Sequence, residues 1–265
     1  MISRKFRTSV RYFKYILSAR SKFKVHSPFV FKFYTGLILD KSPQSAYSRI
    51  EKQRSLLLRQ RSLLETTDFG TGAGQNEYKT RFRQVRSITR SSSISPKFGA
   101  LIYRLVKYAE PDEILEVGTA MGISTLYIAA AAPKSNIVTM EGCAVIAEKS
   151  RENFNHMGIG NIELVMGNFN HLLAKTVSNF EKLDFVLIDG NHRKKPTLDY
   201  FSKILPKLHS GSIVVIDDIN WSKGMEEAWD EIRKHESVTV SIDLFRTGIL
   251  LFKENVAKEN FVLRF

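Results

Sequence analysis

The sequence predicts an α/β fold with a mostly parallel sheet covered by helices on both faces, preceded by a basic helical segment. Three observations predict this. From about residue 96 onward, short apolar segments alternate with amphipathic segments of helical length. A glycine-containing turn, EVGTAMG at 116–122, joins an apolar segment to an apolar helix. The charge is also uneven, because residues 1–110 carry 23 Lys and Arg against 6 Asp and Glu, whereas residues 111–265 carry 17 against 21.

The expected strands are short and apolar, and the last two form a closing hairpin. They are 113–117, 136–141, 162–167, 183–190, 211–218, 237–243 and 247–254. The expected helices between them show apolar residues at helical spacing. They are 97–110, 122–132, 143–157, 171–180, 196–208 and 224–235. This alternation predicts parallel strands joined by helical crossovers.

Residues 1–92 are expected to form a basic helical segment, and residues 93–265 the α/β domain. Ser27 and Pro28 are a suitable cap and first residue for a helix over 28–39. Residues 66–95 are polar, basic and rich in Gly and Ser, which predicts a long loop or mobile cover.

The basic segment has several interpretations. A solvated helical surface explains it, and so does contact with an anionic substrate, a nucleic acid or an acidic membrane surface. Phe6, Val10, Phe13 and Leu17 recur at helical spacing among basic residues. Such a helix can lie on anionic lipid or dock on its own domain.

The composition favours a cytoplasmic protein. The single cysteine, Cys143, cannot form an intrachain disulfide, so a reducing compartment is expected. No apolar run approaches the roughly 20 residues that span a bilayer. The N-terminus is rich in Arg and Ser, like a transit peptide, but its density of aromatic residues favours a folded helix.

Two glycine-rich stretches compete as the ligand-binding loop. DFGTGAG at 68–74 lacks an apolar helix after it, so it is expected to be either a coincidence or a flexible lid. EVGTAMG at 116–122 follows a strand and precedes a helix, whose free N–H groups can face a ligand. Glu141 ends the next strand 25 positions after Glu116, near the roughly 20-residue offset of a ribose-binding carboxylate. The second stretch is therefore the predicted site.

The turn is not G-x-G-x-x-G, which disfavours NAD and FAD. ILEVGTAMGISTLYIA resembles motif I of class I S-adenosylmethionine (SAM)-dependent methyltransferases, in the version carried by catechol and caffeoyl-CoA O-methyltransferases. The resemblance runs from about Ser95 to the C-terminus and includes Lys97 and Gly99. It implies a Rossmann-like sheet of seven strands with an antiparallel last hairpin.

The resemblance also implies which residues bind SAM. Glu116, Gly118 and Ser124 are expected at the methionine end, with Thr119 and Gly122 completing the turn. The ribose hydroxyls are expected on Glu141, although a solvent-exposed strand end is the alternative for this residue. The adenine is expected near two residues that follow the third strand, Asn168 and Phe169.

Carboxylates follow two of the expected strands. Asp189 follows one, and Asp217 and Asp218 follow the next, where ligands of α/β sheets bind. A divalent cation, Mg²⁺ above all, would stabilise three clustered carboxylates. The resembled families hold a metal with an Asp and an Asp-Asn pair followed by Trp, here Trp221; Asp218 replaces the Asn. The alternative is that these acids cap loops and contact the cofactor without a metal.

His192 lies three residues after Asp189, where catechol O-methyltransferases place a lysine base. With a reference histidine pKa of about 6.5, it could accept a proton near neutral pH. Asp189 and His192 are thus the candidate catalytic residues, and a surface role in starting the next helix is the alternative for His192. The next three residues are basic, and they could either bind an anionic acceptor or form a solvated turn: Arg193, Lys194 and Lys195.

The sequence therefore predicts a SAM-dependent O-methyltransferase acting on a small molecule, with anionic acceptors among the candidates. No (N/D)-P-P-(Y/F) motif of the N-methyltransferases is present. An RNA methyltransferase would use the basic N-terminal half, but no RNA-binding signature accompanies it. A non-enzymatic membrane or scaffold protein is the third hypothesis. The sequence leaves a homodimer open.

Overall fold

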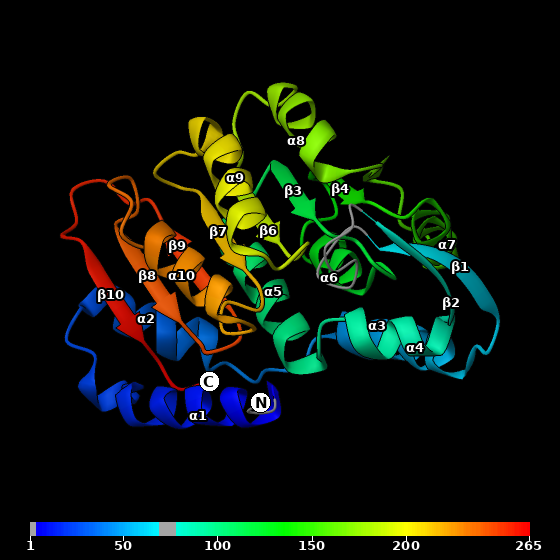
Figure 1. Ribbon diagram of the computed structural model, residues 1–265. Helices are drawn as coiled ribbons and strands as arrows, with labels where there is room; N and C mark the ends of the chain where they lie inside the picture. Colours follow the sequence, from blue (N-terminus) through cyan, green and yellow to red (C-terminus); the bar gives the residue numbers. More distant parts are fainter. Residues whose placement is uncertain (1–3, 69–77) are drawn as a thin grey trace.

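The computed structural model describes residues 4–68 and 78–265 (Figure 1). Its main sheet has eight strands in the order β10-β8-β9-β7-β6-β3-β4-β5. Their bounds are β3 Glu113–Val117, β4 Asn136–Glu141, β5 Ile162–Met166, β6 Phe185–Ile188, β7 Ile213–Ile216, β8 Val240–Asp243, β9 Gly248–Leu251 and β10 Glu259–Val262. Only β9 runs antiparallel to its neighbours, as the predicted hairpin requires. The eighth strand, β10, adds a parallel edge beside β8.

Helices cover both faces of this sheet because its central strands are apolar on both sides. All four residues of β6 are buried, and they alternate between two hydrophobic clusters. One cluster packs against the helices α5, α6 and α7, and the other against α8, α9 and α10. The bounds of these helices are α5 Pro96–Ala109, α6 Ile123–Ala131, α7 Ala144–His156, α8 Phe169–Ser178, α9 Lys194–Ile204 and α10 Lys223–Ile232. The predicted α/β fold is confirmed.

The N-terminal segment packs on the α5–α7 face. Val30, Ile50 and Leu57 belong to the same hydrophobic cluster as the residues of α5 and α6. The elements of this segment are α1 Arg4–Ser18, η1 Lys22–Lys24, α2 Pro28–Phe33, η2 Tyr34–Ile38, α3 Ser45–Arg59, β1 Leu63–Asp68, β2 Lys79–Gln84 and α4 Val85–Ser92. The helix expected over 28–39 is α2 continued by the π-helical turn η2.

Within the stretch predicted as a long loop or mobile cover, residues 66–68 and 79–92 form regular secondary structure, so the long loop was wrong there. β1 and β2 form an antiparallel hairpin, and the helix α4 follows directly. Pairing satisfies the backbone of these polar strands, and the Thr66 hydroxyl donates to the Arg81 carbonyl at 2.9 Å. Val85 and Ile88, three residues apart, bury one side of α4. The glycines at 70–74 lie outside the described residues.

The first helix, α1, docks at the turn between β8 and β9 (Figure 1). The rings of Tyr12 and Tyr15 lie 5.0 and 5.3 Å from the ring of Phe245 in that turn. Arg11 forms an ion pair with Glu226 of α10. Neither α1 nor any other helix among the described residues is long and apolar enough to cross a membrane.

Candidate functional site

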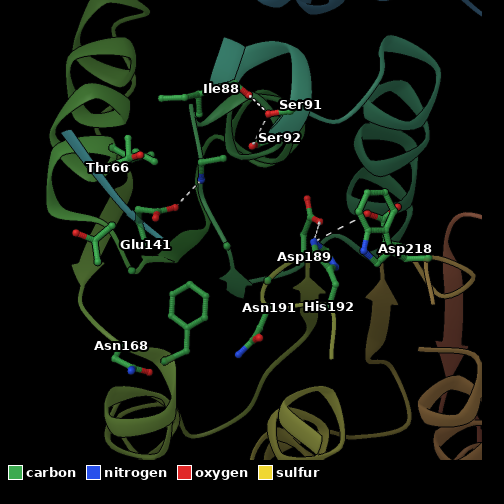
Figure 2. Close-up of a pocket in the computed structure, with 18 of the residues that line it drawn as sticks. Thr66, Ile88, Ser91, Ser92, Glu141, Asn168, Asp189, Asn191, His192 and Asp218 are labelled. Carbon is green, nitrogen blue, oxygen red and sulfur yellow. Dashed lines mark hydrogen bonds and ion pairs between the residues drawn. The ribbon is translucent and has the colours of Figure 1, made fainter. Parts of the chain in front are cut away.

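A cavity of about 280 Å³ lies at the carboxyl ends of β3, β4, β6 and β7, with β1 and α4 contributing to its wall (Figure 2). Seven of the predicted site residues line it: Gly118, Glu141, Asn168, Phe169, Asp189, His192 and Asp218. Five others do not: Glu116, Thr119, Gly122, Ser124 and Asp217. The sequence therefore placed seven of its twelve candidate residues around one cavity at the carboxyl edge of the sheet, although several residues of the glycine turn do not line it.

The glycine turn lies against the loop after β6. Gly118 has a φ of +108°, in the region that favours glycine, and its backbone faces the carbonyl of Asp189. The Asp189 N–H donates to the carbonyl of Val117 at 2.9 Å, and the Gly118 N–H to that of Met140 at 3.0 Å. The missing side chain at Gly118 thus brings the turn and the Asp189 loop together at the floor of the cavity.

Glu141 is oriented by the backbone around it. Its Oε2 accepts a hydrogen bond from the Ala120 N–H at 2.8 Å, and its Oε1 accepts one from the Cys143 N–H at 2.9 Å. Carboxylate oxygens can each accept a second hydrogen bond. Because Glu141 lines the cavity beside Gly142, its oxygens suit two neighbouring hydroxyls, as on a ribose.

Asn168 and Phe169 lie beyond Glu141, where α8 begins. The Asn168 side chain caps this helix by accepting from the Asn170 N–H at 3.0 Å. The ring of Phe169 lies against Gly190, where a Cβ would come within 2.8 Å of it, and packs edge-on against Tyr200. This fixed ring gives the cavity an apolar wall that suits a flat heterocycle.

Glu116 lies behind the turn, with none of its surface exposed. Its Oε2 accepts from the hydroxyls of Thr125 at 2.5 Å and Thr139 at 2.6 Å. Its Oε1 has no hydrogen-bond partner within residues 4–68 and 78–265. Burial raises the pKa of Glu116 to about 7, although the neighbouring hydroxyls favour its charge. Glu116 thus anchors α6 and β4 behind the cavity and keeps one oxygen for a further donor.

This burial predicts a loss of stability as pH rises. An unfolded glutamate ionises near 4.5, whereas folded Glu116 holds its proton up to about 7. Through Glu116 alone, the ligand-free protein should therefore lose on the order of 3 kcal/mol of stability between these two values, and this contribution should not change further above them. Urea unfolding of the wild type and of Glu116→Gln from pH 5 to 8 tests this. The difference in unfolding free energy should move in favour of the variant as pH rises, and a constant difference would contradict the assignment.

Asp217, which directly follows β7 and was predicted as a metal ligand, forms an ion pair with Arg246. Arg246, from the β8–β9 turn, contacts both oxygens of Asp217 at distances down to 2.8 Å. The Thr247 hydroxyl donates to Asp217 at 2.7 Å. The Arg246 Nε also lies 3.4 Å from an oxygen of Asp218. Burial opposes the guanidinium charge, but the carboxylates of Asp217, Asp218 and Asp189 outweigh it and raise the pKa of Arg246.

A divalent cation does not fit these carboxylates as they are arranged. Asp217 is 1% exposed and turned toward Arg246, away from the cavity that Asp189 and Asp218 line. Within the described ranges, no group of three or more His, Cys, Asp and Glu side chains is placed to hold a metal ion. The sequence predicted that Mg²⁺ would neutralise these carboxylates. In the structure, the guanidinium of Arg246 contacts Asp217 and Asp218 instead.

His192 lies between two of these acids (Figure 2). Its Nε2 is 3.7 Å from Asp189 Oδ1 and 4.0 Å from Asp218 Oδ2. Burial and the charges of Asp217 and Asp218 raise the pKa of Asp189 well above its usual range. His192 and Asn191 both have positive φ, at 44° and 68°, as non-glycine residues near active sites sometimes do. This backbone holds the imidazole at the cavity wall.

Sequence reasoning missed the cavity residues of the N-terminal segment and Arg246. Thr66, Thr67, Arg83, Ile88, Ser91 and Ser92 line the side opposite the sheet. The sequence predicted a long loop or mobile cover over this stretch, but its polar context did not single out these residues. Of the basic run after His192, Lys194 pairs with Glu227 and Glu231 at 3.3 and 3.5 Å, outside the cavity, which agrees with the solvated-turn alternative for this residue.

Residues 115–219 match the family model described as a methyltransferase domain. Over 136 residues the chain is 34% identical to a probable O-methyltransferase of Mycobacterium tuberculosis, covering 48% of this chain and 58% of that protein. Over 130 residues it is 28% identical to a catechol O-methyltransferase of Niastella koreensis, with the same two coverages. The match thus spans less than two thirds of either relative.

The fold of nearly the whole chain is that of solved O-methyltransferases. One is the enzyme of Bacillus cereus in complex with SAH, with a TM-score of 0.56 and 16% identity over 84% of this chain and 97% of that one. Another is TomG of Streptomyces achromogenes in complex with SAM, with a TM-score of 0.57 and 17% identity over 96% and 100%. Together with the family match, these likenesses confirm the predicted resemblance to class I SAM-dependent methyltransferases.

Proposed function

We propose that the protein is a SAM-dependent O-methyltransferase that acts on a hydroxyl of a small molecule. One observation carries this proposal: a single cavity presents both the Glu141 carboxylate, oriented for ribose hydroxyls, and the imidazole of His192. The Gly118 turn and the Phe169 wall suit the rest of the cofactor.

When bound, SAM supplies an electrophilic methyl group. The residues of this chain then have two tasks, to align the acceptor oxygen and to remove its proton. His192 faces the cavity and accepts the hydroxyl proton at its imidazole. Asp189 and Asp218 lie within 4.0 Å of Nε2, and the negative charge that this acidic pair carries stabilises the imidazolium that forms.

We further infer that this chemistry needs no metal. Arg246 neutralises Asp217 and faces Asp218, so the site already holds a permanent cation. In the part of the cavity wall contributed by the N-terminal segment, Arg83 donates to Ser91 at 2.7 Å and Ser92 follows, which supports a small acceptor with an anionic or strongly polar group.

The proton-accepting role of His192 predicts a kinetic effect with little change in cofactor binding. His192→Ala should lower turnover at least about tenfold, because the acceptor hydroxyl loses its base. Affinity for SAM, measured by calorimetry, should stay within about twofold, since Glu141 and the glycine turn are untouched. A catechol is a suitable first acceptor, because one relative is a catechol O-methyltransferase.

His171→Ala is the matched control, because His171 is an exposed histidine on α8 outside the cavity. It should leave turnover and affinity unchanged. Equal turnover in the wild type and His192→Ala would remove the base assignment. Failure of the wild type to bind SAM at all would reject the enzymatic proposal as a whole.

A further inference from the structure

The outer side of α1 carries an apolar stripe that the protein leaves exposed. Val10, Phe13 and Leu17 are 40%, 65% and 72% exposed. The helix packs on the protein through another side, where Tyr15 and Ala19 are buried. With a period of about 3.6 residues, these two sides lie roughly opposite each other around the helix. Docking of α1 on its own domain therefore does not explain the stripe.

A fourth apolar side chain follows in the next turn of chain. Phe23, in the 3-10 helix η1 (Lys22–Lys24), is 84% exposed. It stands between two exposed lysines, and the ammonium of Lys22 lies 5.2 Å from the centre of its ring. An aromatic ring flanked by lysines suits the boundary between lipid headgroups and acyl chains. We call Val10, Phe13, Leu17 and Phe23 the apolar stripe.

The charges around the apolar stripe are positive. Lys14 and Arg20 are exposed on or just after α1, and Lys22 and Lys24 flank Phe23. The first acidic residue of the chain is Asp40. A second copy of this surface would meet it with like charges, and the phosphates of a nucleic acid would leave the aliphatic Val10 and Leu17 in water. A layer with negative headgroups above an apolar interior matches both features.

We propose that α1 and η1 bind the surface of an anionic phospholipid bilayer, with the apolar stripe below the headgroups and the lysines among them. The helix would lie along the plane of the interface (Figure 1), where α1 occupies the outside of the molecule. This proposal is independent of the methyl-transfer chemistry, because none of its residues lines the site cavity.

Sedimentation with vesicles tests the proposal on the chain of residues 1–265. We expect binding to vesicles of phosphatidylcholine with about 30% phosphatidylserine, and at least about tenfold weaker binding to phosphatidylcholine alone. Raising the salt concentration should weaken the anionic binding. Replacing Phe13, Leu17 and Phe23 with alanine should reduce it at least about tenfold, and so should replacing Lys14, Lys22 and Lys24 with glutamate.

Val256→Ala is the control for the apolar stripe, because Val256 is 39% exposed and lies in a different region of the chain. It should bind vesicles like the wild type, and melting temperatures should show that every variant is folded. Absence of vesicle binding, or equal binding by the triple-alanine variant, would overturn the proposal. The proposal would also be overturned if vesicle binding is absent and the protein binds RNA instead. In that case the glutamate variant should lose RNA binding and the triple-alanine variant should keep it.

Discussion

Gly118→Ala should unfold the protein more easily and abolish SAM binding. A Cβ at this position would fall well inside contact distance of the Asp189 carbonyl oxygen, which is backbone and cannot rotate away. The φ of +108° is also poorly accessible to alanine. We expect a loss of at least about 3 kcal/mol in the free energy of unfolding, because strain and steric overlap add. Urea unfolding measures this loss, and calorimetry of any folded variant measures SAM binding.

Gly158→Ala separates backbone strain from steric overlap with a neighbouring atom. Gly158 has a φ of +68°, but a Cβ there would meet no atom within 4 Å. Its replacement should cost about 1 kcal/mol from backbone strain alone and leave SAM binding intact. If Gly118→Ala costs no more than this control, the turn does not depend on close approach to Asp189, and the account of the cavity floor is wrong.

The sequence predicted the parts of the site that local patterns specify. The alternation of apolar strands and helices placed Gly118, Glu141 and Asp189 at the carboxyl ends of neighbouring parallel strands, and the structure brings all three to one cavity. The pattern could not show which residues of the turn face inward. Glu116 precedes Gly118 by only two residues, yet the strand period directs its side chain behind the cavity.

Long-range pairing explains the other differences. Arg246 lies in a hairpin turn 29 residues after Asp217, and its local sequence, LFRTG, resembles any polar turn. The strand β2, Lys79–Gln84, is polar and largely exposed, so no apolar alternation marks it. β10 is a short edge strand beside β8, which again gives a weak pattern. In each case the structure of the segment is determined by the distant part of the chain that it pairs with, rather than by its own sequence.

Arg246→Ala should have the second large effect. Asp217 is 1% exposed, and removal of the guanidinium would leave its carboxylate buried without a cation. Removing one partner of a fully buried ion pair costs about 3–5 kcal/mol. The Arg246 side chain is 35% exposed and Asp217 keeps its hydrogen bond from Thr247, so we expect a loss below this range but above that of a surface ion pair. Asp217→Asn in the Arg246→Ala background should recover part of this loss, because the uncompensated charge is gone. Thermal and urea unfolding of the two single variants and the double variant measure the coupling.

Arg246→Ala also tests whether a guanidinium or a metal ion neutralises Asp217 and Asp218. In the wild type, EDTA and added Mg²⁺ should leave the melting temperature and turnover unchanged, because Arg246 already neutralises the carboxylates. In Arg246→Ala, Asp217 and Asp218 lose their cation, and Mg²⁺ at millimolar concentration should raise the melting temperature. Arg246→Lys is the control, since it keeps a charge without the two-point contact and should respond weakly. A wild type that loses turnover in EDTA and regains it with Mg²⁺ would show that the metal predicted from the sequence is used, and that Arg246 moves aside to admit it.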